Sequence, residues 1–362
     1  MSNIFGNILK LSIFGESHSE AIGVVLDGLP SGLRLDFDEI QKEMARRAPG
    51  RDRFSTPRKE ADIPRIVSGF FEGRTTGTPL CALIENTNTR SKDYSRGPLR
   101  PSHADFTAEM RYHGFQDYRG GGHFSGRITA PLVFAGAVLK PYLQAQGIEI
   151  FAHIKSIGTK SEAAFNSAHP DLAAYRKLKE QPLAVLEESS LQTFSDEMDA
   201  ARKAQDSIGG VIECMVYGVP AGLGSPFFDS VESRLSAMLF SVPAVKGVEF
   251  GAGFSIATMR GSEANDPFYF EGDAIHTKTN NTGGINGGIT NGMPVCFSVA
   301  IRPTPSIAQA QSTVNLITGK EETLAIHGRH DPCIVPRAVS VIEAVAAFVT
   351  ADLMLEAKTY AE

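Results

Sequence analysis

Two apolar segments constrain the fold most strongly. Residues 129–146 are apolar on nearly every side, which is typical of a helix buried at the centre of a protein. Pro141 is expected to kink this helix or to end it early. Residues 338–355 are interpreted as a second apolar helix. Segments rich in β-strand flank these helices and do not alternate regularly with them, so the sequence predicts an α+β fold and not a doubly wound sheet.

The remaining elements are shorter. Strands are predicted at residues 8–13, 23–28 and 211–219. Asp36 followed by Glu39 is typical of a helix start, and residues 229–242 form an amphipathic pattern. Residues 51–128 hold few helical patterns and are expected to be loops and short strands, where binding residues are common. Residues 160–206 are expected to be polar, peripheral helices.

Composition excludes several classes of protein. The chain has 362 residues and a net charge of −6, which does not favour nucleic acid as a partner. Its four cysteines lie far apart without a C-x-x-C pair, which argues against a zinc site and fits reduced thiols. Neither a signal peptide nor a run of about 18 apolar residues is found. The chain is long enough for one large domain or two, and we expect a cytoplasmic protein with no metal and no membrane partner.

Arginine is concentrated between residues 46 and 65. This stretch holds six arginines and Lys59 against three acidic residues. The planar guanidinium of arginine suits phosphates and carboxylates, so the run is consistent with an anionic ligand. A solvated surface loop with scattered ion pairs is an equal alternative. Nucleic acid is less favoured, because Phe54 is the only aromatic residue in the run.

Histidine occurs repeatedly beside glycine, serine or proline. His18, His103 and His123 lie in such strings, and residues 327–334 run His-Gly-Arg-His-Asp-Pro-Cys-Ile. The last string could pair an anion, titrate near neutral pH and orient a base. A lone histidine is more often a structural residue, and His113 and His276 are interpreted in that way.

Two glycine-rich turns cover residues 120–127 and 283–288. Neither matches the dinucleotide fingerprint G-x-G-x-x-G, and no phosphate-binding G-x-x-x-x-G-K-[ST] loop occurs in the chain. The first turn places permissive backbone just before a helix, where N–H groups can approach a phosphate. When each stretch is taken alone, a tight surface turn is the favoured interpretation.

Taken together, the strings resemble one family over nearly the whole chain. They are Phe14-Gly15-Glu16-Ser17-His18, Arg46-Arg47-Ala48-Pro49-Gly50, Phe71-Glu72-Gly73-Arg74-Thr75-Thr76-Gly77-Thr78-Pro79, Ile84-Glu85-Asn86-Thr87-Asn88, His103-Ala104-Asp105, Asp117-Tyr118-Arg119-Gly120-Gly121-Gly122, Asp206-Ser207-Ile208-Gly209-Gly210, Gly218-Val219-Pro220-Ala221-Gly222-Leu223-Gly224, Ala244-Val245-Lys246-Gly247-Val248-Glu249, Arg302-Pro303-Thr304-Pro305-Ser306-Ile307 and Gly328-Arg329-His330-Asp331-Pro332-Cys333. In this order and spacing they resemble chorismate synthase.

The resemblance implies a carbon–oxygen lyase at the last step of the shikimate pathway to aromatic amino acids. In an anti-1,4-elimination, phosphate leaves 5-enolpyruvylshikimate 3-phosphate and a ring proton is lost, which gives chorismate. Reduced FMN is required although no net redox change occurs, and NADPH is a candidate reductant. The resemblance also implies a homotetramer and a single domain over residues 1–362, in which antiparallel β-sheets pack around central helices as a β-α-β sandwich.

The same resemblance implies the residues of the site. His18 is expected near the leaving phosphate, His103 near the flavin, where its protonation could stabilise a reduced, anionic flavin, and Asp331 where it helps flavin N5 take the substrate proton. The implied substrate-binding residues are Ser17, Arg47, Arg53, Lys59, Arg100, Arg127 and Arg329. The implied FMN contacts are His123, Phe124, Ser125, Ala244, Gly287, Arg302, Pro303, Thr304, Pro305, Ser306 and Arg329. Arg47 and Arg53 also match positions associated with NADPH.

Five positions depart from the residues usual in the family. They are Ser19, His123, Gly126, Pro243 and Arg302, where Gly, Arg, Ala, Asn and Lys are usual. Most lie around the expected flavin site, and Arg302 keeps the charge of lysine but not its geometry. A flavin oxidoreductase with another electron acceptor and a non-catalytic anion-binding protein remain alternatives. Retention of the histidines and of an aspartate beside arginine argues against the latter, because anion binding needs no acid–base pair.

Overall fold

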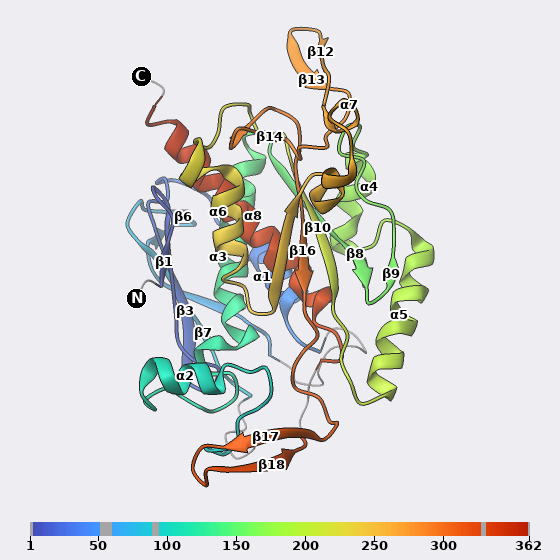
Figure 1. The fold of residues 1–362 in the computed structure, drawn as a ribbon. Coiled ribbons are helices and arrows are strands. Elements are labelled where there is room, and N and C mark those ends of the chain that lie inside the picture. Colours follow the sequence, from blue (N-terminus) through green and yellow to red (C-terminus); the bar gives the residue numbers. More distant parts are fainter. Residues whose placement is uncertain (1–2, 51–59, 89–93, 327–330, 361–362) are drawn as a thin grey trace.

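Two five-stranded antiparallel sheets enclose a layer of helices (Figure 1). The computed structural model describes residues 3–50, 60–88, 94–326 and 331–360. The first sheet has the spatial order β1 (Ile4–Phe5), β2 (Lys10–Phe14), β3 (Ala21–Asp27), β7 (Leu80–Glu85) and β4 (Pro64–Ser68). The second has the order β11 (Val245–Phe250), β16 (Val295–Ile301), β10 (Gly210–Tyr217), β8 (Glu149–Ile157) and β9 (Lys160–Ser161). This arrangement confirms the predicted α+β class.

Three helices form the layer between the sheets. They are α1 (Phe37–Arg47), α3 (Thr129–Gln144) and α8 (Val335–Ala357). They contact one another, α3 also contacts β2, β3 and β7 of the first sheet, and α8 contacts β8 and β10 of the second. The other helices are α2 (Asp105–Tyr112), α4 (Leu172–Arg176), α5 (Glu188–Lys203), α6 (Val231–Leu239) and α7 (Gly261–Ala264), with the 3-10 helices η2 (Gly122–Phe124), η3 (Gly126–Ile128), η4 (Lys177–Glu180), η5 (Phe227–Asp229) and η6 (Gly253–Thr258).

Two-stranded hairpins extend from this sandwich. They are β5 (Phe70–Phe71) with β6 (Arg74–Thr75), β12 (Phe268–Glu271) with β13 (Ala274–Thr277), β14 (Ile285–Asn286) with β15 (Ile289–Thr290), and β17 (Gln311–Asn315) with β18 (Lys320–Leu324). In Figure 1 the β17–β18 hairpin and α2 lie at one end of the molecule, while β12–β13 and β14 lie at the other. The two ends therefore carry different loops, and only one of them holds the cavity described below.

The central helices α3 and α8 pack closely because small residues face each other. A Cβ atom added to Gly136 would lie 2.4 Å from the Cβ of Ala344, so a larger side chain would force the helices apart. By length and composition alone α8 could cross a membrane, but 83% of its most apolar window is buried inside the protein. The figure shows α8 between the two sheets, which is the place of a core helix.

Charged residues are also buried in this helical layer. Glu343 of α8 accepts hydrogen bonds from Arg46 of α1, at 2.6 and 2.8 Å, and from Lys140 of α3, at 2.5 Å. Burial alone would raise the pKa of Glu343, but the neighbouring Arg46 and Lys140 lower it far below its usual value. The apolar pattern of the two helices did not predict this network, which ties all three helices together.

The predicted elements are largely present, with different ends. Pro141 falls in the last turn of α3, which ends at Gln144. Asp36 caps α1, since its carboxylate accepts hydrogen bonds from the backbone N–H groups of Asp38 and Glu39. The predicted amphipathic helix at 229–242 is shorter, as α6. Helix α2 was not predicted, because its short sequence has no strong apolar stripe.

Candidate active site

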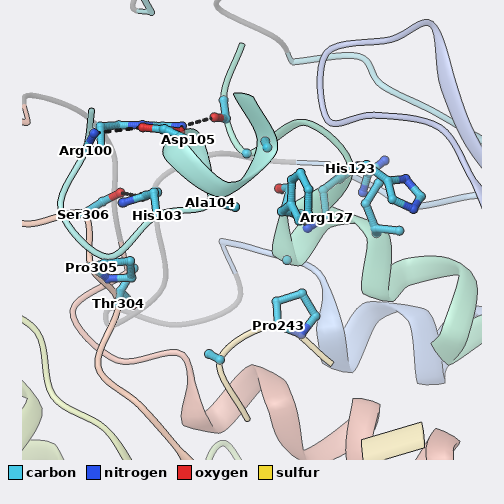
Figure 2. A pocket seen from close by; sticks show the side chains of 18 of the residues that line it. Arg100, His103, Ala104, Asp105, His123, Arg127, Pro243, Thr304, Pro305 and Ser306 are labelled. Carbon is cyan, nitrogen blue, oxygen red and sulfur yellow. Dashed lines mark hydrogen bonds and ion pairs between the residues drawn. The ribbon is translucent and has the colours of Figure 1, made fainter. Parts of the chain in front are cut away.

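A cavity of about 1310 Å³ opens at the end of the sandwich near α2 and the β17–β18 hairpin. Its wall includes residues at the N-terminal ends of α3 and α8, among them Thr129 and Arg337. Helix N-termini carry partial positive charge and present N–H groups, so both helices favour an anion in this cavity. Figure 2 shows the His103 group on one side of the cavity and the Arg127–His123 group on the other, with Pro243 below.

His18 lies in the tight turn that follows β2. Its Nδ1 is 3.1 Å from Oγ of Ser17, whose backbone N–H donates to the carbonyl of Gly122. The rings of His18 and Tyr94 pack in a T-shaped arrangement, at 5.2 Å between ring centroids. Gly120 covers the ring on another side, and a Cβ there would lie 2.5 Å from Cε1 of His18. His18 lines the cavity, whereas Ser17 is only 2% exposed and supports it from behind.

Two of the predicted substrate arginines share a buried carboxylate. Arg47, at the end of α1, donates to Oδ2 of Asp62 at 2.6 Å, and Arg127 donates to Oδ1 of the same residue. Glu60 lies 3.4 Å from Nη1 of Arg127, which also donates from Nε to the side chain of Asn86. Both arginines line the cavity and are nearly buried. The cavity wall thus holds guanidinium groups in fixed positions before a ligand arrives.

The electrostatics of this cluster follow from burial. Desolvation lowers the pKa of Arg47 to about 10, helped by the nearby charges of Arg337 and Arg127 and opposed by Asp62. Although burial opposes it, the charges of Arg47 and Arg127 lower the pKa of Asp62. Arg47 and Asp62 are therefore both charged at neutral pH. Asp62 adopts a left-handed backbone with φ of 48°, which is unusual for a residue other than glycine.

His103 lies in a second group, together with Arg100, Asp105 and Ser306 (Figure 2). Its Nδ1 is 3.2 Å from the carbonyl of Pro101, so Nδ1 carries the proton, and Nε2 then accepts from Oγ of Ser306 at 2.8 Å. Burial, followed by the charge of Arg100, lowers the pKa of His103 to about 4. The ring is neutral at pH 7 in this structure, so the predicted protonation of His103 requires an added negative charge beside it.

Arg100 is held by Asp105 rather than pointing freely into the cavity. It donates from Nε and Nη2 to the two carboxylate oxygens of Asp105, at 2.9 and 2.6 Å, and from Nη2 to the carbonyl of Gly120. The guanidinium also lies over the ring of Tyr94, at 5.5 Å from its centroid. Arg100 therefore connects the His103 group to the turn that covers His18.

Asp331 lies just before α8, at the cavity wall. Its Oδ2 accepts a hydrogen bond from Nη1 of Arg337 at 2.5 Å, and Nε of Arg337 donates to the backbone carbonyl of Arg47 at 2.9 Å. Sequence reasoning missed Arg337, Asp62 and Asn86, since their roles depend on contacts between distant segments. Arg53, Lys59 and Arg329 lie outside the described residues, as do residues 327–330 of the histidine-rich string.

Most of the predicted flavin contacts meet at the same cavity. His123, Phe124, Ser125, Ala244, Arg302, Thr304, Pro305 and Ser306 all line it. Nε of Arg302 and Oγ1 of Thr304 are buried and have no hydrogen-bond partner among the residues that the structure describes. Buried polar atoms without partners are costly, so this pair fits a bound ligand that offers hydrogen-bonding oxygens.

Gly287 and Pro303 do not line the cavity, so their assignment to it is not supported within one chain. Gly287 forms the turn of the β14–β15 hairpin, at the opposite end of the molecule in Figure 1 from α2. The hairpin is held there because Gly288 accepts a hydrogen bond from the backbone of Val231, at the start of α6. Matching by sequence position could not reveal at which end of the sandwich this hairpin lies.

Two of the departures have local structural explanations. Oγ of Ser19 accepts from the backbone N–H of Glu16 and lies 2.8 Å from two backbone carbonyls, so it stabilises the turn that carries His18. Nδ1 of His123 is 2.8 Å from the carbonyl of Gly15 and donates to it. His123 therefore stabilises the same turn.

The sandwich and its cavity define an enzyme that acts on a small anionic substrate with histidine and carboxylate groups beside fixed arginines. The family model described as chorismate synthase matches residues 9–355. The chain belongs to the chorismate synthase family, which confirms the resemblance found in the sequence.

Known proteins of this family are similar over the full length. The chorismate synthase of Dehalococcoides mccartyi (strain ATCC BAA-2100 / JCM 16839 / KCTC 5957 / BAV1) is 46% identical over 359 residues, covering 99% of this chain and 98% of its own. That of Thermococcus kodakarensis is 45% identical, covering 98% of each chain. A solved structure titled "Crystal Structure of Chorismate Synthase" matches with a TM-score of 0.77 and 30% identity, covering 98% of this chain and 93% of that chain.

Proposed function

We propose that this cavity converts 5-enolpyruvylshikimate 3-phosphate to chorismate. Chorismate synthase activity, the last step of the shikimate pathway, is the activity of the family to which the chain belongs. The observation that carries the assignment to this cavity is that His18, His103 and Asp331 line it together with Arg47 and Arg127. These residues come from distant parts of the sequence.

The substrate carries a phosphate and two carboxylates, and the cavity supplies matching charges. Arg47 and Arg127 are fixed through Asp62, so they can bind anionic groups without losing much conformational freedom. His18 is positioned by Ser17 and Gly120 to give a proton or a hydrogen bond to phosphate as it departs. Asp331, held by Arg337, is the carboxylate that assists removal of the ring proton.

Reduced FMN is the cofactor of the family, and the cavity has groups suited to it. Ser125, Ala244, Arg302, Thr304 and the Pro305–Ser306 segment would hold it, and the unpartnered atoms of Arg302 and Thr304 support this placement. When bound, reduced FMN supplies the electron-rich group that promotes elimination without net oxidation. The cavity volume of about 1310 Å³ exceeds that of a usual single-ligand pocket, as two neighbouring ligands require.

Other properties of the family extend this proposal. We infer a homotetramer in the cytoplasm, a single domain over residues 1–362, and reduction of FMN by an external reductant or by NADPH. The contacts of α1, α3 and α8 with one another, of α3 with the first sheet and of α8 with the second support the single domain. Buried thiols at Cys214 and Cys296, whose pKa values burial raises, are consistent with a reducing compartment.

Replacement of His18 tests the site directly. His18→Ala is expected to lower anaerobic turnover with chemically reduced FMN by about 100-fold or more, while FMN binding survives. His276→Ala is the matched control, because His276 lies on β13 and is absent from the cavity wall. Turnover of His18→Ala equal to that of the control would show that the assignment of His18 is wrong.

A further inference from the structure

Arg337 joins three structural elements at the cavity wall. It is the third residue of α8 and follows Pro336, which fixes the first turn of the helix. Its Nη1 donates to Oδ2 of Asp331 at 2.5 Å, in the segment that precedes α8. Its Nε donates to the backbone carbonyl of Arg47 at 2.9 Å, at the last residue of α1. One rigid guanidinium therefore bridges α8, the segment of Asp331 and the end of α1.

Each of these hydrogen bonds has a physical consequence. The last carbonyls of a helix lack an intrahelical partner, so Nε of Arg337 satisfies one of them at the end of α1. The backbone position of Arg47 is thereby fixed, while its side chain is fixed by Asp62. The contact through Nη1 is a charge-assisted hydrogen bond, which restrains the orientation of the Asp331 carboxylate.

Arg337 connects the group that binds substrate anions with the group that assists proton removal. Arg47 belongs to the group that binds substrate anions, and Asp331 is the group that assists proton removal. Asp331, Arg337 and Arg47 all line the same cavity. Since both groups are bonded to one guanidinium, a substrate anchored by Arg47 is presented to Asp331 with a defined geometry.

We propose that Arg337 is a positioning residue for proton removal, which holds the carboxylate of Asp331 at a fixed position relative to the anion-binding end of α1. The inference rests on the proposed role of Asp331 and adds to it a residue that acts through Asp331 and Arg47. Lysine could not replace Arg337 fully, because a single ammonium group does not reproduce two N–H donors pointing in the directions of Nε and Nη1.

The experiment compares Arg337→Gln, Arg337→Lys and Asp331→Asn with the unmodified enzyme. Each is assayed anaerobically with dithionite-reduced FMN, and kcat and KM are measured with normal substrate and with substrate deuterated at the ring carbon that loses the proton. Arg337→Gln is expected to lower kcat by about 10- to 100-fold, change KM less than about 3-fold and raise the deuterium isotope effect on kcat. Arg337→Lys should restore part of kcat, because it keeps the positive charge.

Arg234→Lys is the matched control. Arg234 is a buried arginine that also uses two nitrogens, donating to Asp352 and Glu356 of α8, but it does not line the cavity. Its replacement is expected to lower the melting temperature without changing the isotope effect. If kcat falls for Arg337→Gln while the isotope effect does not change, Arg337 is a structural residue like Arg234, and the inference is overturned.

Failure of the inference and failure of the proposed site are distinguishable. If Asp331→Asn slows turnover and raises the isotope effect while Arg337→Gln and Arg337→Lys do neither, Asp331 acts without Arg337 and only the inference is wrong. If Asp331→Asn itself leaves kcat and the isotope effect unchanged, the role proposed for Asp331 is wrong and the inference falls with it. If Arg337→Gln does not fold, Arg337→Lys decides through the same isotope effect.

Discussion

Gly120 offers a sharp test of how His18 is positioned. Its backbone is left-handed, with φ of 62°. A Cβ at this position would lie 2.5 Å from Cε1 and 2.7 Å from Nδ1 of His18, and 2.8 Å from Oγ of Ser17. Ordinary contacts begin at 3.4 Å, so the change Gly120→Ala must displace the ring of His18, the Gly120 backbone or both.

The size of the effect follows from this geometry. If the ring takes up the movement, it withdraws by about 1 Å, and a misplacement of that size can cost about 100-fold in rate. We therefore expect kcat for Gly120→Ala to fall by about 10- to 100-fold. The left-handed backbone adds a stability loss of about 1 to 2 kcal/mol, which would appear as a lower melting temperature.

Gly32→Ala separates the two effects. Gly32 has a similar φ of 84°, but a Cβ there would meet no atom within 4 Å, and Gly32 does not line the cavity. The control should lose comparable stability and keep its activity. The assay is anaerobic turnover with reduced FMN, alongside thermal unfolding of both variants. Activity of Gly120→Ala within about 2-fold of the unmodified enzyme would refute the packing argument for His18.

Three further predictions concern buried ionisable groups. Lys140→Met should lower the free energy of unfolding by about 3 kcal/mol in urea titrations, because it removes one cation from Glu343. The pKa of Glu343 is lowered in the folded state, so its contribution to stability is present above the ordinary carboxyl pKa of 4.5 and is lost as the pH falls. The free energy of unfolding should therefore decrease from pH 7 to pH 4, and it should decrease less in Glu343→Gln. In the absence of flavin, the NMR signals of His103 should stay those of a neutral ring from pH 8 to about 5.5, since its pKa is about 4, and a midpoint near 6.5 would contradict the burial argument.

The framework of the fold could be predicted because its signals are local. The start of α3 near Thr129, the cap of α1 at Asp36 and the apolar character of α8 all depend on neighbouring residues. The partners inside that framework could not be predicted in this way. Lys140 and Glu343 are more than 200 positions apart, and only the packing of α3 against α8 brings them together.

The residues of the site likewise divide into those that the sequence could reveal and those that only the structure shows. His18, His103 and Asp331 were found from distinctive strings, and the structure places all three at one cavity. Asp62 was visible only as one acidic residue within an arginine-rich run, and nothing in the sequence indicated that it binds both Arg47 and Arg127. The glycine-rich turn at residues 283–288 was only a weak signal when taken alone, and its sequence could not reveal that the β14–β15 hairpin lies at the other end of the sandwich.

The most direct test of the account is anaerobic turnover of 5-enolpyruvylshikimate 3-phosphate by the purified full chain, with chorismate measured as product. One arm supplies FMN reduced by dithionite, and the other supplies FMN with NADPH as the only reductant. Chorismate in the first arm is the predicted result, and the second arm then decides whether the chain also reduces its flavin. Folded protein that forms no chorismate with dithionite-reduced FMN would contradict the proposed function.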